Sequence, residues 1–166
     1  MTYETLPTTV PWNRIFRDFA HEPRAERDML TPNAKGQTVR SEKINSPTFT
    51  DIDWDEGYFK FCKFEGLSIE GRQVTSDFVG CSFKNIDWYW GLFSGCNFIN
   101  CDFKDCAFAG AGFPDSRFVD CKLVNCRFTQ DHLGGDCDFS KTIAYGCSVE
   151  SSLGFGPFSS TVISTG

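Results

Sequence analysis

Nine cysteines are the residues in this sequence whose chemistry has to be considered first. Thiols at suitable spacings form disulfides or bind zinc, and thiolates act as nucleophiles. Here the count is odd, no two cysteines form a C-x-x-C pair, and the chain has only two histidines, His21 and His132. The spacing therefore predicts neither a disulfide framework nor a metal site, and no cofactor is expected.

Other catalytic arrangements are equally hard to find. The sequence shows no grouping typical of a Ser/His/Asp triad, and the glycine-rich stretch at 154–158 (GFGPF) lacks the strand, helix and lysine that a phosphate loop requires. The many carboxylates fit a charged outer surface. We therefore expect a protein that is not an enzyme.

The elements that position these residues follow a period of five. Every fifth residue from Phe78 to Leu133 is apolar, and we call these residues the centres. The residue two places before each centre is small or of modest size, except Asp131. A period of five fits neither a helix nor a simple strand, so it is an internal repeat. The centres are Phe78, Phe83, Trp88, Phe93, Phe98, Phe103, Phe108, Phe113, Phe118, Leu123, Phe128 and Leu133.

Such a repeat predicts a square coil. If each pentad turns by about a quarter of a circle, about 20 residues close one coil, and coils stack at the strand spacing of about 4.8 Å. The same step of five continues on both sides of these centres, through Phe64 before them and through Phe139 and Val149 after them. Every cysteine lies two residues before one of these apolar positions, so we expect the thiols to be buried as small apolar side chains. Reduced thiols suit a cytoplasmic protein.

The repeat resembles the pentapeptide-repeat family. The residues at 96–98 (CNF), 101–103 (CDF) and 137–139 (CDF) are similar to the family's pentad of a small residue, Asp or Asn, and Leu or Phe. The resemblance implies an all-β, right-handed four-sided β-helix of about five coils. It also implies a possible function, because some family members mimic DNA and protect a type II topoisomerase, gyrase.

Three segments are expected along the chain. Residues 1–45 are predicted to be a helical cap and a polar connector (31–45), with a partner-binding arm as the alternative. Residues 46–150 form the β-helix, and residues 151–166 form a C-terminal capping tail. The helix is indicated by the spacing of Trp12, Ile15, Phe16 and Phe19.

The phase of the repeat slips by one residue between Val74 and Phe78, and again between Leu133 and Phe139. Arg72 and Asp131 are the two charged residues at inward positions, and each lies just before a slip. Because burying a lone charge is costly, we expect the backbone to bulge outward at both places, with surface loops at 71–73 and 132–136.

Two outward groups are candidates for partner binding. Tyr89, Trp90 and Leu92 are predicted to project from one corner, although the cap or tail covering them is an equal alternative. The second group is an acidic stretch beside two aromatic residues: Asp51, Asp53, Asp55, Glu56, Tyr58 and Phe61.

The net charge of −6 argues against binding of nucleic acid, and no apolar run is long enough to span a membrane. We expect a monomer that binds a protein. One hypothesis is an immunity protein that neutralises a bacterial toxin, such as a basic nuclease, by covering its active site. The other is the DNA mimic of the topoisomerase-binding relatives, which predicts continuous acidic stripes. A scaffold for an unknown partner is the third.

Overall fold

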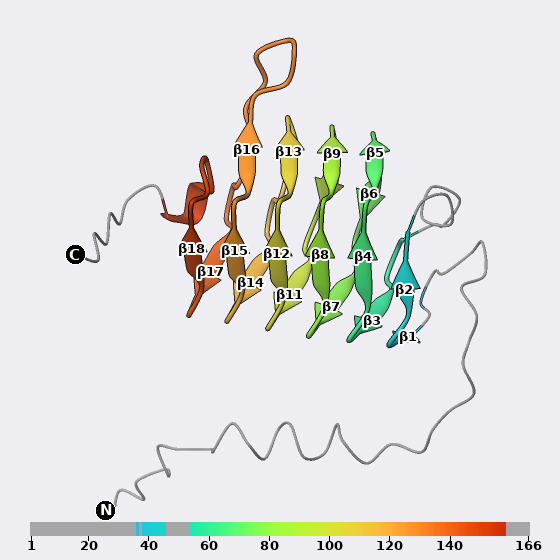
Figure 1. The fold of residues 1–166 in the computed structure, drawn as a ribbon. Helices are drawn as coiled ribbons and strands as arrows, with labels where there is room; N and C mark the ends of the chain where they lie inside the picture. The colour runs from blue at the N-terminus through green and yellow to red at the C-terminus, as the bar shows by residue number, and fades with distance from the viewer. Residues whose placement is uncertain (1–35, 37, 46–53, 159–166) are drawn as a thin grey trace, which may run out of the picture.

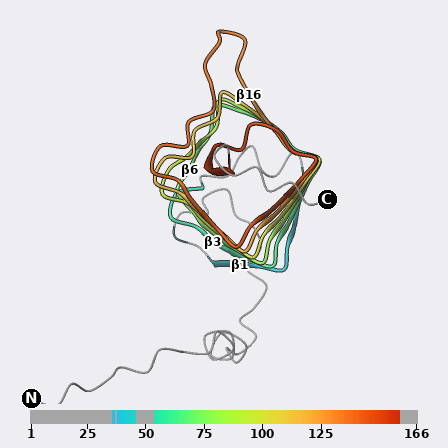
Figure 2. The ribbon, with the colours of Figure 1, turned by 90° about the vertical axis from the view of Figure 1, so that its left-hand side faces the viewer.

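The computed structural model describes residues 36, 38–45 and 54–158. Their chain winds into a four-sided parallel β-helix, as the period of five predicts (Figures 1 and 2). Four complete turns run from Phe59 to Phe139, with a partial turn at each end. Within the described ranges, no helix is long and apolar enough to cross a membrane.

Each side of the coil is a parallel sheet, and we number the faces in chain order. Face 1 contains β1 (Thr38–Arg40), β3 (Tyr58–Lys60), β7 (Asp77–Val79), β11 (Asn97–Ile99), β14 (Arg117–Val119) and β17 (Ile143–Tyr145). Face 2 contains β2 (Lys43–Ile44), β4 (Lys63–Glu65), β8 (Ser82–Lys84), β12 (Asp102–Lys104), β15 (Lys122–Val124) and β18 (Ser148–Glu150). Face 3 contains β5 (Ser68–Glu70), β9 (Asp87–Tyr89), β13 (Ala107–Ala109) and β16 (Arg127–Thr129). Face 4 contains β6 (Gln73–Val74) and β10 (Leu92–Phe93), extended by single bridges at Trp54, Gly112 and Asp138.

The corners explain much of the remaining sequence. The residue two places after a centre has a left-handed backbone at most corners, as at Asn100 (φ 51°), Asp120 (φ 51°) and Gly80 (φ 62°). Asn, Asp and Gly adopt this conformation most readily. Two aromatic residues, Phe61 (φ 57°) and Trp90 (φ 55°), occupy the same position. The backbone is strained at both residues, because bulky side chains disfavour the left-handed conformation. The conformational preference of the residue therefore does not explain why Phe and Trp occupy these two corners.

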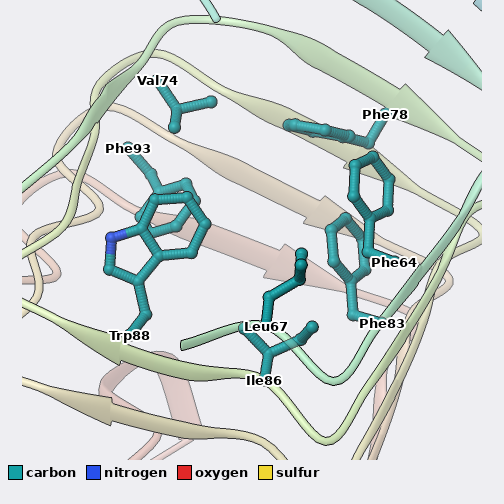
Figure 3. Close-up of a pocket in the computed structure, with 8 residues that line it drawn as sticks. All are labelled: Phe64, Leu67, Val74, Phe78, Phe83, Ile86, Trp88 and Phe93. Carbon is teal, nitrogen blue, oxygen red and sulfur yellow. The ribbon is translucent and has the colours of Figure 1, made fainter. Parts of the chain in front are cut away.

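The aromatic centres fill the axis. Phe78 stacks on Phe98 at 5.1 Å between ring centroids, and Phe98 stacks on Phe118 at 4.7 Å. Figure 3 shows the same stacking of Phe64 on Phe83, at 4.7 Å. The gap among these side chains is about the size of one water molecule and is lined by apolar groups, so it is no ligand site.

The thiols lie at the inner corners, as predicted. All nine are free, seven are buried, and Cys137 and Cys147 are partly exposed. The Cys101 thiol donates to the carbonyl of Phe78, one coil earlier, at 3.4 Å. Burial raises the pKa of the Cys96 thiol to about 12, so this thiol is a poor nucleophile.

The first slip differs from the prediction. The bridge between Trp54 and Val74 spans 20 residues, but the register of Phe59 with Phe78 spans only 19. The irregularity is therefore a corner shortened by one residue, and the expected bulge at 71–73 was wrong. The Arg72 side chain is exposed, while its backbone carbonyl accepts a hydrogen bond from the amide of Leu92 on the next coil. The backbone of Arg72 therefore keeps the hydrogen bonding between coils, and the charge stays in solvent.

The second slip is a loop, as predicted, but it begins earlier. The bridge between Gly112 and Asp138 spans 26 residues, six more than a regular coil. Residues 130–136 form the loop, which projects beyond the ends of β13 and β9 (Figures 1 and 2). Leu133, which the period of five counts as a centre, is 76% exposed. That assignment was wrong, because the repeat has already broken at Asp131.

Both ends of the coil contain buried residues that the period of five did not identify. β1 and β2 lie within the stretch expected to be a connector, where Val39 and Ile44 are buried and five residues apart. At the other end, Phe155 is buried against the rings of Phe118 and Phe139, just before the 3-10 turn η1 (Gly156–Phe158). The helix predicted before residue 36 lies outside the described residues.

Candidate partner-binding loop and aromatic corner

The candidate site is the 130–136 loop together with the aromatic corner beside it on face 3. Tyr89 ends β9 and Trp90 follows it at the corner between faces 3 and 4. β13 and β16 follow on the next two coils, and the loop leaves the end of β16 (Figure 1). The six inserted residues therefore extend from β16 back over the coil of β13 and reach Tyr89 and Trp90 at the end of β9.

A single carboxylate fixes the loop. Asp131 Oδ1 accepts the backbone N–H groups of Leu133 and Gly135, each at 2.8 Å, and its own amide donates to the Gly135 carbonyl at 2.9 Å. Asp131 Oδ2 accepts the indole N–H of Trp90 at 2.6 Å. These bonds lower the pKa of the Asp131 carboxyl below its ordinary value, with the Trp90 indole as the main cause.

A second contact joins the loop to β9. The His132 ring stacks on Tyr89 with an interplanar angle of 11°, and its Nδ1 is hydrogen-bonded to the Tyr89 hydroxyl. The His132 amide donates to the same hydroxyl at 3.2 Å. Two adjacent loop residues are therefore held by two adjacent residues of the aromatic corner.

Gly110, on the coil between, allows this approach. A Cβ at Gly110 would lie 2.8 Å from the Asp131 Cβ and 3.0 Å from Trp90 Cδ1. Gly110 also has a left-handed backbone (φ 57°). Only glycine satisfies both demands without moving the loop.

The site is suited to recognition. Leu133 at the loop tip is the most exposed large hydrophobic residue of the described chain, and Trp90 is 38% exposed. Exposed apolar and aromatic side chains on a fixed backbone are typical anchors of protein interfaces. Among the described residues, no cluster of three His, Cys, Asp or Glu side chains is suited to a metal ion.

The predicted aromatic group lies mainly at this site. Tyr89 is partly buried beneath loop 130–136. Most of the cap and tail that the sequence offered as alternative covers lies outside the described residues. Leu92 starts β10 around the corner on face 4, 40% exposed, with its side chain against Gly112.

The predicted acidic group is spread over several surfaces. Asp55 and Glu56 lie at the short corner, where Thr75 Oγ1 donates to Asp55 Oδ1 at 3.2 Å. Tyr58 lies on face 1, and Phe61 lies at the corner between faces 1 and 2, 55% exposed. Asp51 and Asp53 lie outside the described residues.

The repeat pattern did not identify Asp131, His132 or Leu133 as site residues. The available signal was Asp131, which is charged at a position where the repeat requires a small side chain, followed by Gly134 and Gly135. That signal predicts a loop, but the contacts with Tyr89 and Trp90 depend on a return across one coil.

Charge is dispersed over the four faces. In the described residues, no outward column carries carboxylates on two successive coils. Face 2 instead carries five lysines: Lys43, Lys63, Lys84, Lys104 and Lys122. The described surface therefore lacks the continuous acidic stripe that a DNA mimic predicts.

Residues 92–130 match the family model for pentapeptide repeats, in eight copies. The chain contains pentapeptide repeats. This assignment rests on the repeated pentads, and the register of the four faces extends the same repeat on both sides of the matched residues.

Two solved structures are similar to this pentapeptide-repeat protein. One is the pentapeptide repeat protein Rfr23 from the cyanobacterium Cyanothece 51142, which is 12% identical with a TM-score of 0.39, covering 72% of this chain and 86% of Rfr23. The other is a trypsin-treated form of QnrB1, a plasmid-mediated fluoroquinolone resistance protein, which is 16% identical with a TM-score of 0.27, covering 72% of this chain and 68% of QnrB1. No curated protein shows a significant match to the sequence.

Proposed function

We propose that this pentapeptide-repeat protein is a non-catalytic inhibitor that binds one protein partner through the 130–136 loop and the Tyr89–Trp90 pair. The observation that carries the proposal is a projecting loop whose backbone is fixed by its own carboxylate while its leucine stays in solvent. The β-helix beneath supplies the rigid support.

A fixed loop favours tight binding for an energetic reason. Association loses the entropy of every segment that becomes ordered, so a loop already held in one conformation retains more of its contact energy. Asp131 bonds to Trp90 and to the backbone on both sides of Leu133, which holds the tip in place. A narrow projection with an apolar tip also fits a concave site such as an enzyme's active site.

The finer form of the proposal is an immunity protein that neutralises a bacterial toxin in the cytoplasm, with a basic nuclease as the favoured target. The net charge of −6 supports this form, because opposite charge speeds the capture of a basic partner. The alternative, a DNA mimic bound to a type II topoisomerase, gains no support from the dispersed carboxylates.

The test begins with affinity capture by the full-length protein, followed by an activity assay of the captured protein with and without this chain. The key variant is Leu133→Asp, and the matched control is Ile143→Asp, because Ile143 is also exposed (56%) but lies on β17 of face 1, opposite the face that carries the loop. We expect Leu133→Asp to weaken binding by about tenfold or more, and Ile143→Asp to leave it within about twofold.

Two results would decide against the proposal. Equal affinity of Leu133→Asp and the wild type would exclude the loop as the contact. Recovery of topoisomerase subunits, with no toxin among the captured proteins or encoded beside the gene, would replace the immunity function by the alternative.

A further inference from the structure

Face 1 carries an apolar stripe on its outer surface. Val79, Ile99 and Val119 occupy the same outward position on three successive coils, and all three are partly exposed. Tyr145 continues the column, 69% exposed, on β17. At the other end the Phe61 ring lies over Gly80, since a Cβ there would be 2.6 Å from the ring. We call these five residues the face 1 stripe.

Solvent-facing positions of a sheet are normally polar, so an apolar column across several strands marks a contact surface. Its size limits what binds there. A stable interface between two proteins uses about 20–30 residues on each side, whereas the stripe has five. A segment tethered to the same chain needs far less contact, because its effective concentration is in the millimolar range.

We propose that the face 1 stripe is the docking site of the chain's own residues 11–21. This segment contains Trp12, Ile15, Phe16 and Phe19, whose spacing predicts one apolar helical face. A helix of this length would be about 16 Å long. The stripe from Val79 to Tyr145 covers three strand spacings, about 14 Å. The two apolar surfaces therefore match in length and in number of side chains.

The connection permits this placement. Among the described residues, β1 is the first strand after the segment, and it lies at the edge of face 1. Four strand spacings, about 19 Å, separate β1 from β14. Residues 22–37 can extend over about 50 Å, so the segment reaches every part of the stripe.

Amide hydrogen exchange of the full-length protein, resolved by peptide mass spectrometry, tests the proposal. The key variant is Val119→Asp, and the matched control is Val124→Asp. Val124 lies at the same outward position of the next pentad, partly exposed on face 2. We expect the amides of residues 11–21 to exchange about tenfold faster in Val119→Asp than in the wild type. Val124→Asp should match the wild type.

A second variant guards against loss of folding in Val119→Asp. Phe16→Ser leaves every described residue unchanged, and it should raise exchange throughout 11–21 while exchange in β11 and β14 stays the same. Equal exchange of 11–21 in the wild type and both of these variants would overturn the proposal. Protection that decreases on tenfold dilution would also overturn it, because a second copy of the chain would then be the occupant. These readouts need no partner, so they are independent of the proposed inhibitor function.

Discussion

Ser76 shows how one inward side chain pairs the backbone groups at a corner of the coil. At the short corner its hydroxyl donates to the carbonyl of Trp54 at 2.5 Å and accepts the amide of Gly57 at 3.0 Å. Ser76 is fully buried, so neither backbone group has water as a substitute partner. Ser116 makes the same two bonds at a regular corner, to the carbonyl of Phe93 and the amide of Cys96, so an inward serine hydroxyl pairs backbone groups at both kinds of corner.

We expect Ser76→Ala to lower the free energy of unfolding by about 1–3 kcal/mol, because it leaves buried backbone groups unpaired. Urea denaturation at neutral pH measures the change. Ser68→Ala, at an exposed strand position, is the control and should stay within about 0.5 kcal/mol of the wild type. A loss equal to that of the control would show that the corner holds without the hydroxyl.

For single residues, the sequence predicted most of the inward side chains. The prediction was wrong where it depended only on the five-residue spacing. The centres from Phe78 to Phe128 and all nine cysteine positions follow from the five-residue spacing. Leu133 keeps the phase but lies in solvent, because Asp131 cannot enter the inner corner and the chain leaves the coil first. Val39 and Ile44 keep the phase within a polar stretch, where too few centres remain to reveal it.

Among the elements, the 130–136 loop depends on a residue of the neighbouring coil, Gly110, as well as on its own Asp131. Gly110→Ala places a methyl group against Asp131 and Trp90, so the loop must move. Gly95 is a matched control, since it has a similar backbone (φ 64°) with nothing near its Cβ.

We expect both Gly95→Ala and Gly110→Ala to lower stability by about 1 kcal/mol through the backbone strain that they share. Only Gly110→Ala should also weaken partner binding, by about tenfold. Thermal denaturation and titration with the captured partner measure the two effects. Equal affinities of the two variants would mean that the loop conformation is irrelevant to binding.

The loop should also open in acid. The pKa of Asp131 is lowered in the folded loop, so the carboxylate stabilises the loop at pH values above its ordinary pKa of 3.8. This contribution is lost as the pH falls below that value and through the lowered pKa. The Trp90 indole N–H resonance, assigned with Trp90→Phe, should shift towards its solvent-exposed position in this range. In Asp131→Asn the resonance should not change with pH over the same range.

The loop conformation lies beyond what the sequence could predict. The broken repeat and the two glycines indicate that a loop exists, but its return to Tyr89 and Trp90 rests on the stacking of one coil over another. Similarly, Arg72 suggested a bulge because the phase of the repeat assigns it to an inward position. A pentad can keep its backbone hydrogen bonds to the next coil while a charged side chain at the inward position turns outward. The five-residue spacing does not predict this.

For the whole molecule, stability comes from one continuous column of rings. Phe103 is 3% exposed and contacts Phe83 and Phe98, with ring centroids 4.7 Å and 5.5 Å away. We expect Phe103→Ala to cost about 3–5 kcal/mol, because it removes a ring from the middle of the column and leaves a cavity. Chemical denaturation measures the loss, and a value below about 1 kcal/mol would place the ring outside the core.

The fold class was predictable because the repeat imposes the same geometric demand at every pentad, so single irregularities do not hide it. The candidate site was only partly predictable, since Tyr89 and Trp90 were named and their loop partners were not. The regular repeat determines the β-helix, whereas the candidate site lies where the repeat is interrupted.

The reactivity of the thiols in the native protein tests the central claim most directly, because square coils with inward cysteines underlie every surface assignment. Seven thiols are buried, and burial raises the pKa of the Cys96 thiol to about 12. With a water-soluble aromatic disulfide reagent at about pH 8, we expect only Cys137 and Cys147 to react before the protein unfolds. All nine should react in denaturant. Reaction of more than two thiols in the folded protein, at the rate of the denatured chain, would contradict the account.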